Sequence, residues 1–137
     1  MKVAFATDDG LKVNSHFGQS PMFSVYEVRP GEANFVENRP VPVQISQDEG
    51  SRIEMRIHLI EDCTLVFLMQ IGASAAARVT SRKMMPVKVP AGSSIEDQIA
   101  RLLDMLRGKP PMWLSKVLQA EQSGSREELS NEIRSEG

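Results

Sequence analysis

His16 is the residue best suited to metal chemistry in this chain. It lies in the segment NSHFGQSPMF, residues 14–23, shortly after Asn14, directly before Phe17 and two places before Gly18. An imidazole nitrogen can ligate iron directly. From its spacing alone, a surface-loop histidine that merely caps or packs is the preferred interpretation of His16, and an iron ligand is the alternative.

The other candidate ligands have simpler explanations. Cys63 is the only cysteine, so no internal disulfide and no multi-cysteine zinc or iron-sulfur site can form within one chain. It precedes the strand expected over residues 64–72, which places it at the opposite sheet edge from His16, and a buried structural thiol is the preferred interpretation. His58 shares a polar helix face with Glu54 and Glu61, a pattern typical of a solvated ion pair.

The sequence shows no arrangement of residues that is typical of an enzyme active site. A two-metal nuclease needs several carboxylates on central strands. Asp8 and Asp9 follow the first strand, but the strand over residues 64–72 ends in Met-Gln-Ile-Gly and supplies no acid. No histidine is placed to activate Cys63, and Ser15 stands in no nucleophile motif. We expect a protein that is not an enzyme.

The composition is that of a single cytoplasmic domain. The chain has 137 residues, 41% hydrophobic and 25% charged, with a formal net charge of -2. Basic residues are not clustered, which argues against nucleic-acid binding. No apolar run reaches the roughly 18 residues of a membrane span, and the start of the chain lacks a signal-peptide pattern.

Two kinds of periodicity divide the chain. Strands are expected over residues 2–7, 11–13, 22–28 and 33–45, with an Asp9-Gly10 hairpin turn and an edge position for the last of them. Helices follow over 49–62, 73–82 and 93–108, the last with a Ser93-Glu96 capping box, and strands separate them at 64–72 and 84–90. We expect one domain over 1–112 and a largely polar, disordered extension over 113–137.

This order, βββαβαβα, predicts an α/β protein of ribonuclease-H-like architecture, with a five-stranded mixed sheet flanked by helices. Its first strand lies in the middle and runs parallel to the strand over 64–72. The loops after these strands, together with the turn at 90–94, would meet at the carboxyl edge of the sheet. His16 would then lie beside the amino ends of the second and third helices, which favour anionic cargo.

Four segments carry a family resemblance: MKVAFATDDGLKVNSHFGQSPMFSVYEV, CTLVFLMQIGASAAARV, MPVKV and KPPMWL. Together they resemble the NifX family, in the NifX, NifY and NafY group of iron-molybdenum-cofactor-binding domains, over residues 1 to about 118. The resemblance implies a ribonuclease-H-like carrier that receives the iron-sulfur cluster made by NifB and passes it to the NifEN scaffold. It makes His16 the cluster contact and Gly72 the turn glycine whose helix faces the cluster. Ala73-Ser74 stands where a second glycine or a proline is expected.

From these observations we expect a monomeric carrier whose transient cargo is the NifB-made precursor cluster or the iron-molybdenum cofactor. His16 would ligate iron, Phe17 would anchor the loop, Gly18 would supply the backbone freedom to turn it, and Asn14 would hydrogen-bond the loop. Gly72 and Ala73 would complete the cofactor-binding set. The alternatives are an interaction or regulatory module that holds no cluster, and a NafY-like insertase that binds mature cofactor and apo-nitrogenase.

Overall fold

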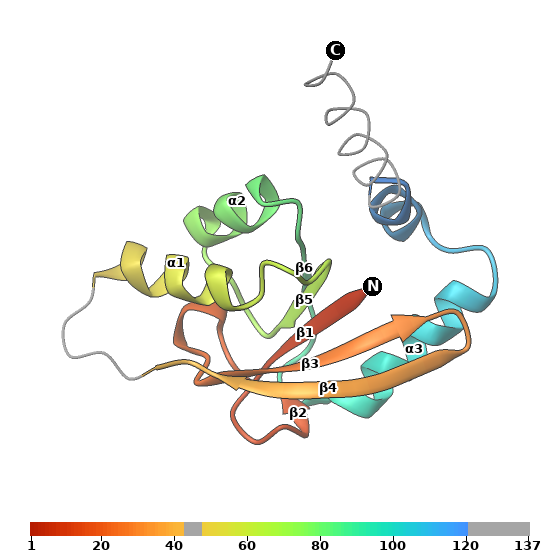
Figure 1. Ribbon diagram of the computed structural model, residues 1–137, viewed down its shortest axis with the longest axis horizontal. Coiled ribbons are helices and arrows are strands. Elements are labelled where there is room, and N and C mark those ends of the chain that lie inside the picture. Colours follow the sequence, from red (N-terminus) through yellow and green to blue (C-terminus); the bar gives the residue numbers. More distant parts are fainter. Residues whose placement is uncertain (43–47, 121–137) are drawn as a thin grey trace, which may run out of the picture.

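The computed structural model describes residues 1–42 and 48–120. Its main sheet has five strands: β1 (Lys2–Thr7), β3 (Met22–Arg29), β4 (Glu32–Pro40), β5 (Leu65–Leu68) and β6 (Met85–Lys88), in the order β4-β3-β1-β5-β6 (Figure 1). β1 is therefore central, and β4, which ends in a proline, forms one edge.

The sheet is mixed. β1 pairs antiparallel with β3 and parallel with β5, in a register that sets Val3 beside Leu65 and Phe5 beside Phe67. β3 pairs antiparallel with β4 around an irregularity at Val25/Tyr26, and β5 pairs parallel with β6. The predicted ribonuclease-H-like arrangement, with its first strand in the middle, is confirmed.

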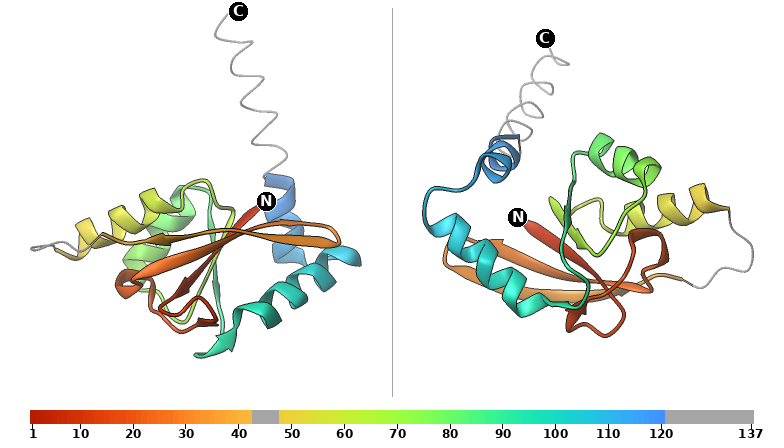
Figure 2. Two further views of the ribbon diagram at one scale, coloured as in Figure 1. Left: turned by 60° about the horizontal axis from the view of Figure 1, so that its bottom comes forward. Right: turned by 180° about the vertical axis from the view of Figure 1, so that it is seen from behind.

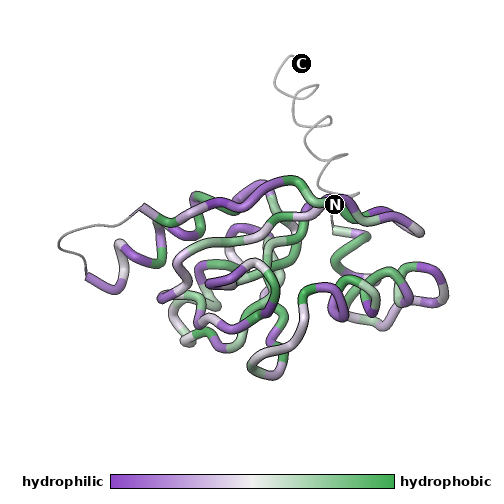
Figure 3. The backbone as a smooth tube through the Cα atoms, turned by 90° about the horizontal axis from the view of Figure 1, so that it is seen from below, coloured by the Kyte–Doolittle hydropathy of each residue, from purple (hydrophilic) through white to green (hydrophobic). Residues whose placement is uncertain are grey.

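Helices cover both faces of this sheet. α1 (Glu49–Leu59) and α2 (Ala73–Ser81) lie on one face, and α3 (Ile95–Arg107) lies on the other (Figure 2). Side chains alternate along the central strands, as strand geometry requires. Ala4 and Val66 pack with the helices α1 and α2, whereas Val3 and Leu65 pack with α3. Figure 3 shows apolar and polar stretches alternating along the backbone as green and purple bands.

Two local expectations were wrong. The Asp9-Gly10 turn does not close a hairpin: β2 (Lys12–Val13) pairs instead with β7 (Ser93–Ser94) in a separate two-stranded sheet. The capping residue of α3 is Ser94, whose hydroxyl accepts from the Asp97 N–H at 3.2 Å, while Ser93 donates to the carbonyl of Pro90. Pairing of β7 with β2 carries the extended backbone one residue beyond the expected cap.

The chain continues past α3 into a second contact with the same face. Residues 112–120 are helical, and Leu114 is fully buried among the residues that α3 packs against. This helix begins one residue before position 113, where the extension was expected to start. Residues 121–137, where the polar composition is strongest, lie outside the described residues, and so do residues 43–45 of the strand expected over 33–45. Across residues 1–42 and 48–120, no helix combines the length and apolarity that crossing a membrane demands.

Candidate functional site

The turn that carries His16 is held directly against the segment after β5. The Phe17 N–H donates to the carbonyl of Gln70 at 2.9 Å, and the Met69 N–H donates to the carbonyl of Ser15 at 3.1 Å. His16 and Gln70 thereby form an isolated parallel bridge beyond the ends of β1 and β5. The expected meeting of these two loops at the carboxyl edge of the sheet is present.

Phe17 anchors this turn in the core. It begins a short 3-10 helix, η1 (Phe17–Gln19), and its side chain is fully buried with a ring centroid 5.8 Å from that of Phe23. Burying a phenylalanine ring stabilises a fold by about 1.5 to 3 kcal/mol. The neighbouring His16 side chain stays partly exposed, and it makes no hydrogen bond to any of the described residues. The loop is fixed while its imidazole remains available.

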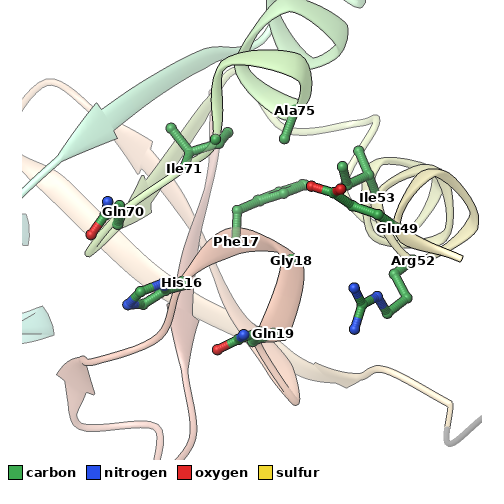
Figure 4. Close-up of a pocket in the computed structure, with 11 residues that line it drawn as sticks. His16, Phe17, Gly18, Gln19, Glu49, Arg52, Ile53, Gln70, Ile71 and Ala75 are labelled. Carbon is green, nitrogen blue, oxygen red and sulfur yellow. The ribbon is translucent and has the colours of Figure 1, made fainter.

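A cavity of about 260 Å³ lies where three segments meet. Its lining comes from residues 16–19, from the first two turns of α1 (Glu49, Arg52 and Ile53), and from residues 70–72 with Ala75 of α2. Figure 4 shows the Phe17 ring pointing toward α1 and α2, with His16 and Gln70 on the other side of the turn. The cavity lining therefore combines an imidazole, two amides, a carboxylate and a guanidinium.

The structure brings four of the six predicted site residues to this cavity: His16, Phe17, Gly18 and Gly72. Asn14 does not line it. Its amide oxygen accepts from the Asp8 N–H at 3.0 Å and its amide nitrogen donates to the Asp8 carboxylate at 2.7 Å, so it does hydrogen-bond the loop. Ala73 is exposed at the start of α2, next to the cavity residue Gly72.

The amino end of α2 lacks a side-chain cap. Gly72 is its capping residue and has no side chain to accept from the first-turn N–H groups, whereas Asp48 caps α1 and Ser94 caps α3. The free N–H groups carry the positive end of the helix dipole. This end of α2 therefore presents hydrogen-bond donors beside Gly72, at the rim of the cavity.

The cavity that His16 lines includes the start of α2, as expected, but no residue of α3. The Ile95 N–H at the start of α3 donates to the carbonyl of Leu11, and the Gly92 N–H donates to that of Val13. The turn after β6 thus docks on the earlier part of the loop, because α3 packs on the opposite face of the sheet from α1 and α2. The first turns of α1, and not the start of α3, line the cavity.

Gly18 and Gly72 line the cavity, but the backbone conformation at neither position requires a glycine. The backbone φ of neither Gly18 nor Gly72 is positive, unlike those of Gly10, Gly31 and Gly92. A Cβ built on either would meet nothing within 4 Å. Gly18 therefore does not supply the backbone freedom expected of it; what it contributes is open space over the turn.

The remaining candidates behave as the sequence indicated. His58 Nδ1 lies 3.5 Å from the Glu61 carboxylate on an exposed surface. Cys63 is buried before β5, at the end of that strand remote from Gln70, and burial, followed by the charge of Asp62, raises the pKa of its thiol to about 12. Within residues 1–42 and 48–120, no three His, Cys, Asp or Glu side chains gather as a metal site.

Sequence reasoning missed Glu49, Arg52 and Gln70. The first two were part of an amphipathic helix whose polar positions gave no sign of facing a cavity. Gln70 has no signature of its own, because a single glutamine at the end of a strand belongs to no binding motif. A possible signal was the spacing of Glu49, Arg52 and Ile53, which puts two charged residues at the border of the apolar helix face.

The chain is similar to several known proteins. The model of the family described as dinitrogenase iron-molybdenum cofactor matches residues 1–105. Protein NifX of Herbaspirillum seropedicae is 34% identical over 120 residues, which cover 87% of this chain and 82% of that protein. Protein NifY of Klebsiella pneumoniae is 37% identical over 115 residues, which cover 84% of this chain and 49% of that protein.

A solved structure, that of a protein called PH0822, shares the fold with a TM-score of 0.60 at 23% identity, over 76% of this chain and 90% of that chain. The family match over residues 1–105 includes the His16 turn, both helices of the cavity and the end of β5. The resemblance seen in the sequence is confirmed. The chain belongs to the dinitrogenase iron-molybdenum cofactor family and, within it, to the NifX group, which serves nitrogen fixation through biosynthesis of that cofactor.

Proposed function

We propose that this protein is a carrier that binds the NifB-made iron-sulfur precursor of the iron-molybdenum cofactor, without catalysing a reaction, and passes it to the NifEN scaffold. It acts as a cytoplasmic monomer. The single observation that supports the proposal most is the His16 imidazole, which lines a cavity at the carboxyl edge of the sheet and has no hydrogen-bond partner among the described residues.

One replaceable ligand suits a carrier. Several thiolates would hold a cluster too firmly for transfer, whereas a binding free energy near -8 kcal/mol, equivalent to a Kd of about 1 μM, permits both loading and release. Membership in the NifX group supports the choice of cargo. The uncapped amino end of α2 supports an anionic one, because free N–H groups at a helix start stabilise negative charge.

The test is anaerobic reconstitution with the NifB-made cluster, followed by desalting and iron analysis. We compare the wild type with His16→Ala and use Cys63→Ala as a matched control, since the thiol is buried at the far end of β5. We expect the wild type and Cys63→Ala to retain the cluster and His16→Ala to lose most of it. Circular dichroism and thermal unfolding establish that each variant is folded.

Cluster retention by His16→Ala equal to that of the wild type would remove His16 from the site. A wild-type protein that stays colourless but still co-purifies with NifEN would refute the carrier function in favour of the interaction module. Titration with the mature iron-molybdenum cofactor distinguishes the insertase, which would prefer it to the precursor.

A further inference from the structure

Arg56 of α1 is a buried cation that has no carboxylate partner among residues 1–42 and 48–120. Its side chain is 8% exposed, and its guanidinium donates to the carbonyl of Ser20 at 3.1 and 3.0 Å and to that of Arg52 at 3.1 Å. Burial, followed by the charge of Arg52, lowers the pKa of Arg56. The carbonyl bonds hold the end of the His16 turn against α1, but they leave the positive charge unneutralised.

Arg52 adds a second positive charge one helical turn earlier. Like charges at this spacing destabilise a helix by a few tenths of a kcal/mol. Within the described residues, neither arginine forms an ion pair, whereas Arg78 and Arg82 on the facing helix α2 both pair with Glu54. Arg52 lines the cavity, so its guanidinium is the cation that a ligand there would meet.

The geometry leaves room for a ligand to contact both sides of the turn. Figure 4 shows Arg52 on the α1 side and His16 on the far side, with Gly18 between them. Since a Cβ at Gly18 would meet nothing within 4 Å, a cargo can lie over this position. The one carboxylate in the lining is Glu49, which opposes an anion and partly offsets Arg52.

We propose that Arg52, with Arg56 behind it, binds the negative charge of a metal-sulfur cluster that lies over Gly18 and reaches His16. This inference rests on the proposed carrier function and deepens it: the cargo forms the ion pair that neither arginine makes with a described residue. The imidazole supplies a bond to iron, and Arg52 distinguishes anionic clusters from neutral or cationic ones.

The test measures the Kd of the NifB-made cluster for charge-altered variants under anaerobic conditions. We expect Arg52→Gln to weaken binding about tenfold, as the loss of one charge-assisted contact would, and Arg52→Lys to retain part of the affinity. Glu49→Gln is expected to bind a few-fold more tightly than the wild type, since a repulsive charge is removed. Raising the salt concentration should weaken the wild type more than Arg52→Gln.

Arg101→Gln is the matched control, because Arg101 is an exposed arginine on α3, on the opposite face of the sheet, and forms no ion pair to a described residue. It should bind like the wild type. Equal affinity of Arg52→Gln and the wild type would overturn the inference while leaving the carrier function intact, and so would equal weakening by Arg101→Gln. Failure of the wild type to bind the cluster would overturn the carrier function and this inference with it.

Discussion

A substitution at Gly18 can separate an effect on folding from an effect on cargo binding. Its φ is not positive and a Cβ would meet nothing within 4 Å, so a larger side chain fits the turn. The same side chain would stand in the open space between His16 and Arg52, where the proposed cargo lies. An effect of substitution here would therefore report on the cargo and not on folding.

We expect Gly18→Val to fold with a Tm within a few degrees of the wild type and to lose cluster retention at least tenfold in Kd, because its branched side chain fills the cargo space. The Kd of Gly18→Ala should lie between those of the wild type and Gly18→Val, because a methyl group fills less of the cargo space than a branched side chain. Anaerobic titration and thermal unfolding measure both effects. Full retention by Gly18→Val would show that the cargo does not lie over this turn.

At the residue scale, the sequence predicted the parts of the site that stand in a motif. His16, Phe17 and Gly72 were found because an imidazole, an aromatic residue and a turn glycine each have a local signature. Arg52 has none. Its place in the cavity lining depends on which side of α1 faces the loop after β1, and that is decided by packing between segments far apart in the chain.

At the scale of elements, an ion-pair cluster fastens the edge strand β4 to the loop before β5. Arg39 donates to both carboxylate oxygens of Asp62 at 2.6 and 2.9 Å and to the carbonyl of Leu59 at 2.8 Å. Lys2 also donates to Asp62. The hydrogen bonds from Arg39, above all, hold the pKa of Asp62 well below its ordinary value.

This arrangement predicts a pH dependence of stability. Because the pKa of Asp62 is lower in the folded state, its stabilisation is present above about pH 4, the usual pKa of the unfolded group, and is lost as the pH falls through the folded value. Asp62→Asn should cost about 0.5 to 1 kcal/mol in the free energy of unfolding at pH 7, since the carboxylate is 43% exposed.

Urea unfolding between pH 7 and pH 2 measures the effect. The wild type should lose stability on acidification more steeply than Asp62→Asn, so that the two curves converge at low pH. Glu32→Gln, which removes an exposed carboxylate at the start of β4 that forms no ion pair to a described residue, should run parallel to the wild type. Parallel curves for wild type and Asp62→Asn would contradict the proposed source of the pH dependence.

The order and type of the main elements could be predicted because each has its own period: continuous or alternating apolar strands, and the Ile53, Ile57 and Ile60 stripe of α1. The pairing partners of short strands could not be predicted from the sequence. Two residues such as Lys12–Val13 carry no signal that selects a distant strand over the nearer β1, and their choice of β7 moved the cap of α3 by one residue.

At the scale of the whole molecule, the helix over residues 112–120 extends the core on the α3 face. Leu114 is fully buried there, while Met112, two residues earlier, is 73% exposed. Figure 1 shows this helix following α3, at the end of the described chain. Its sequence signal was the helical spacing of four apolar residues that pack on this core: Trp113, Leu114, Val117 and Leu118.

We expect Leu114→Ala to lower the free energy of unfolding by about 2 to 4 kcal/mol, the cost of a cavity in a packed core. Met112→Ala, on the same helix but exposed, should change it by less than about 0.5 kcal/mol. Urea titration compares the two. Similar values for both variants would mean that this helix contributes no packing. Cluster retention should be unchanged in either, since the cavity lies on the other face of the sheet.

The bond between the Phe17 N–H and the carbonyl of Gln70 has a consequence for how the protein is made. A nascent chain emerges from the ribosome at about 5 to 20 residues per second, amino terminus first. β1 can pair with β3 early in synthesis. The His16 turn can bond to the segment after β5 only when β5 and the start of α2 have left the exit tunnel. The cavity can therefore form only after Gln70 and the start of α2 have been synthesised, and a truncated translation product that ends before Gln70 would lack the proposed binding site.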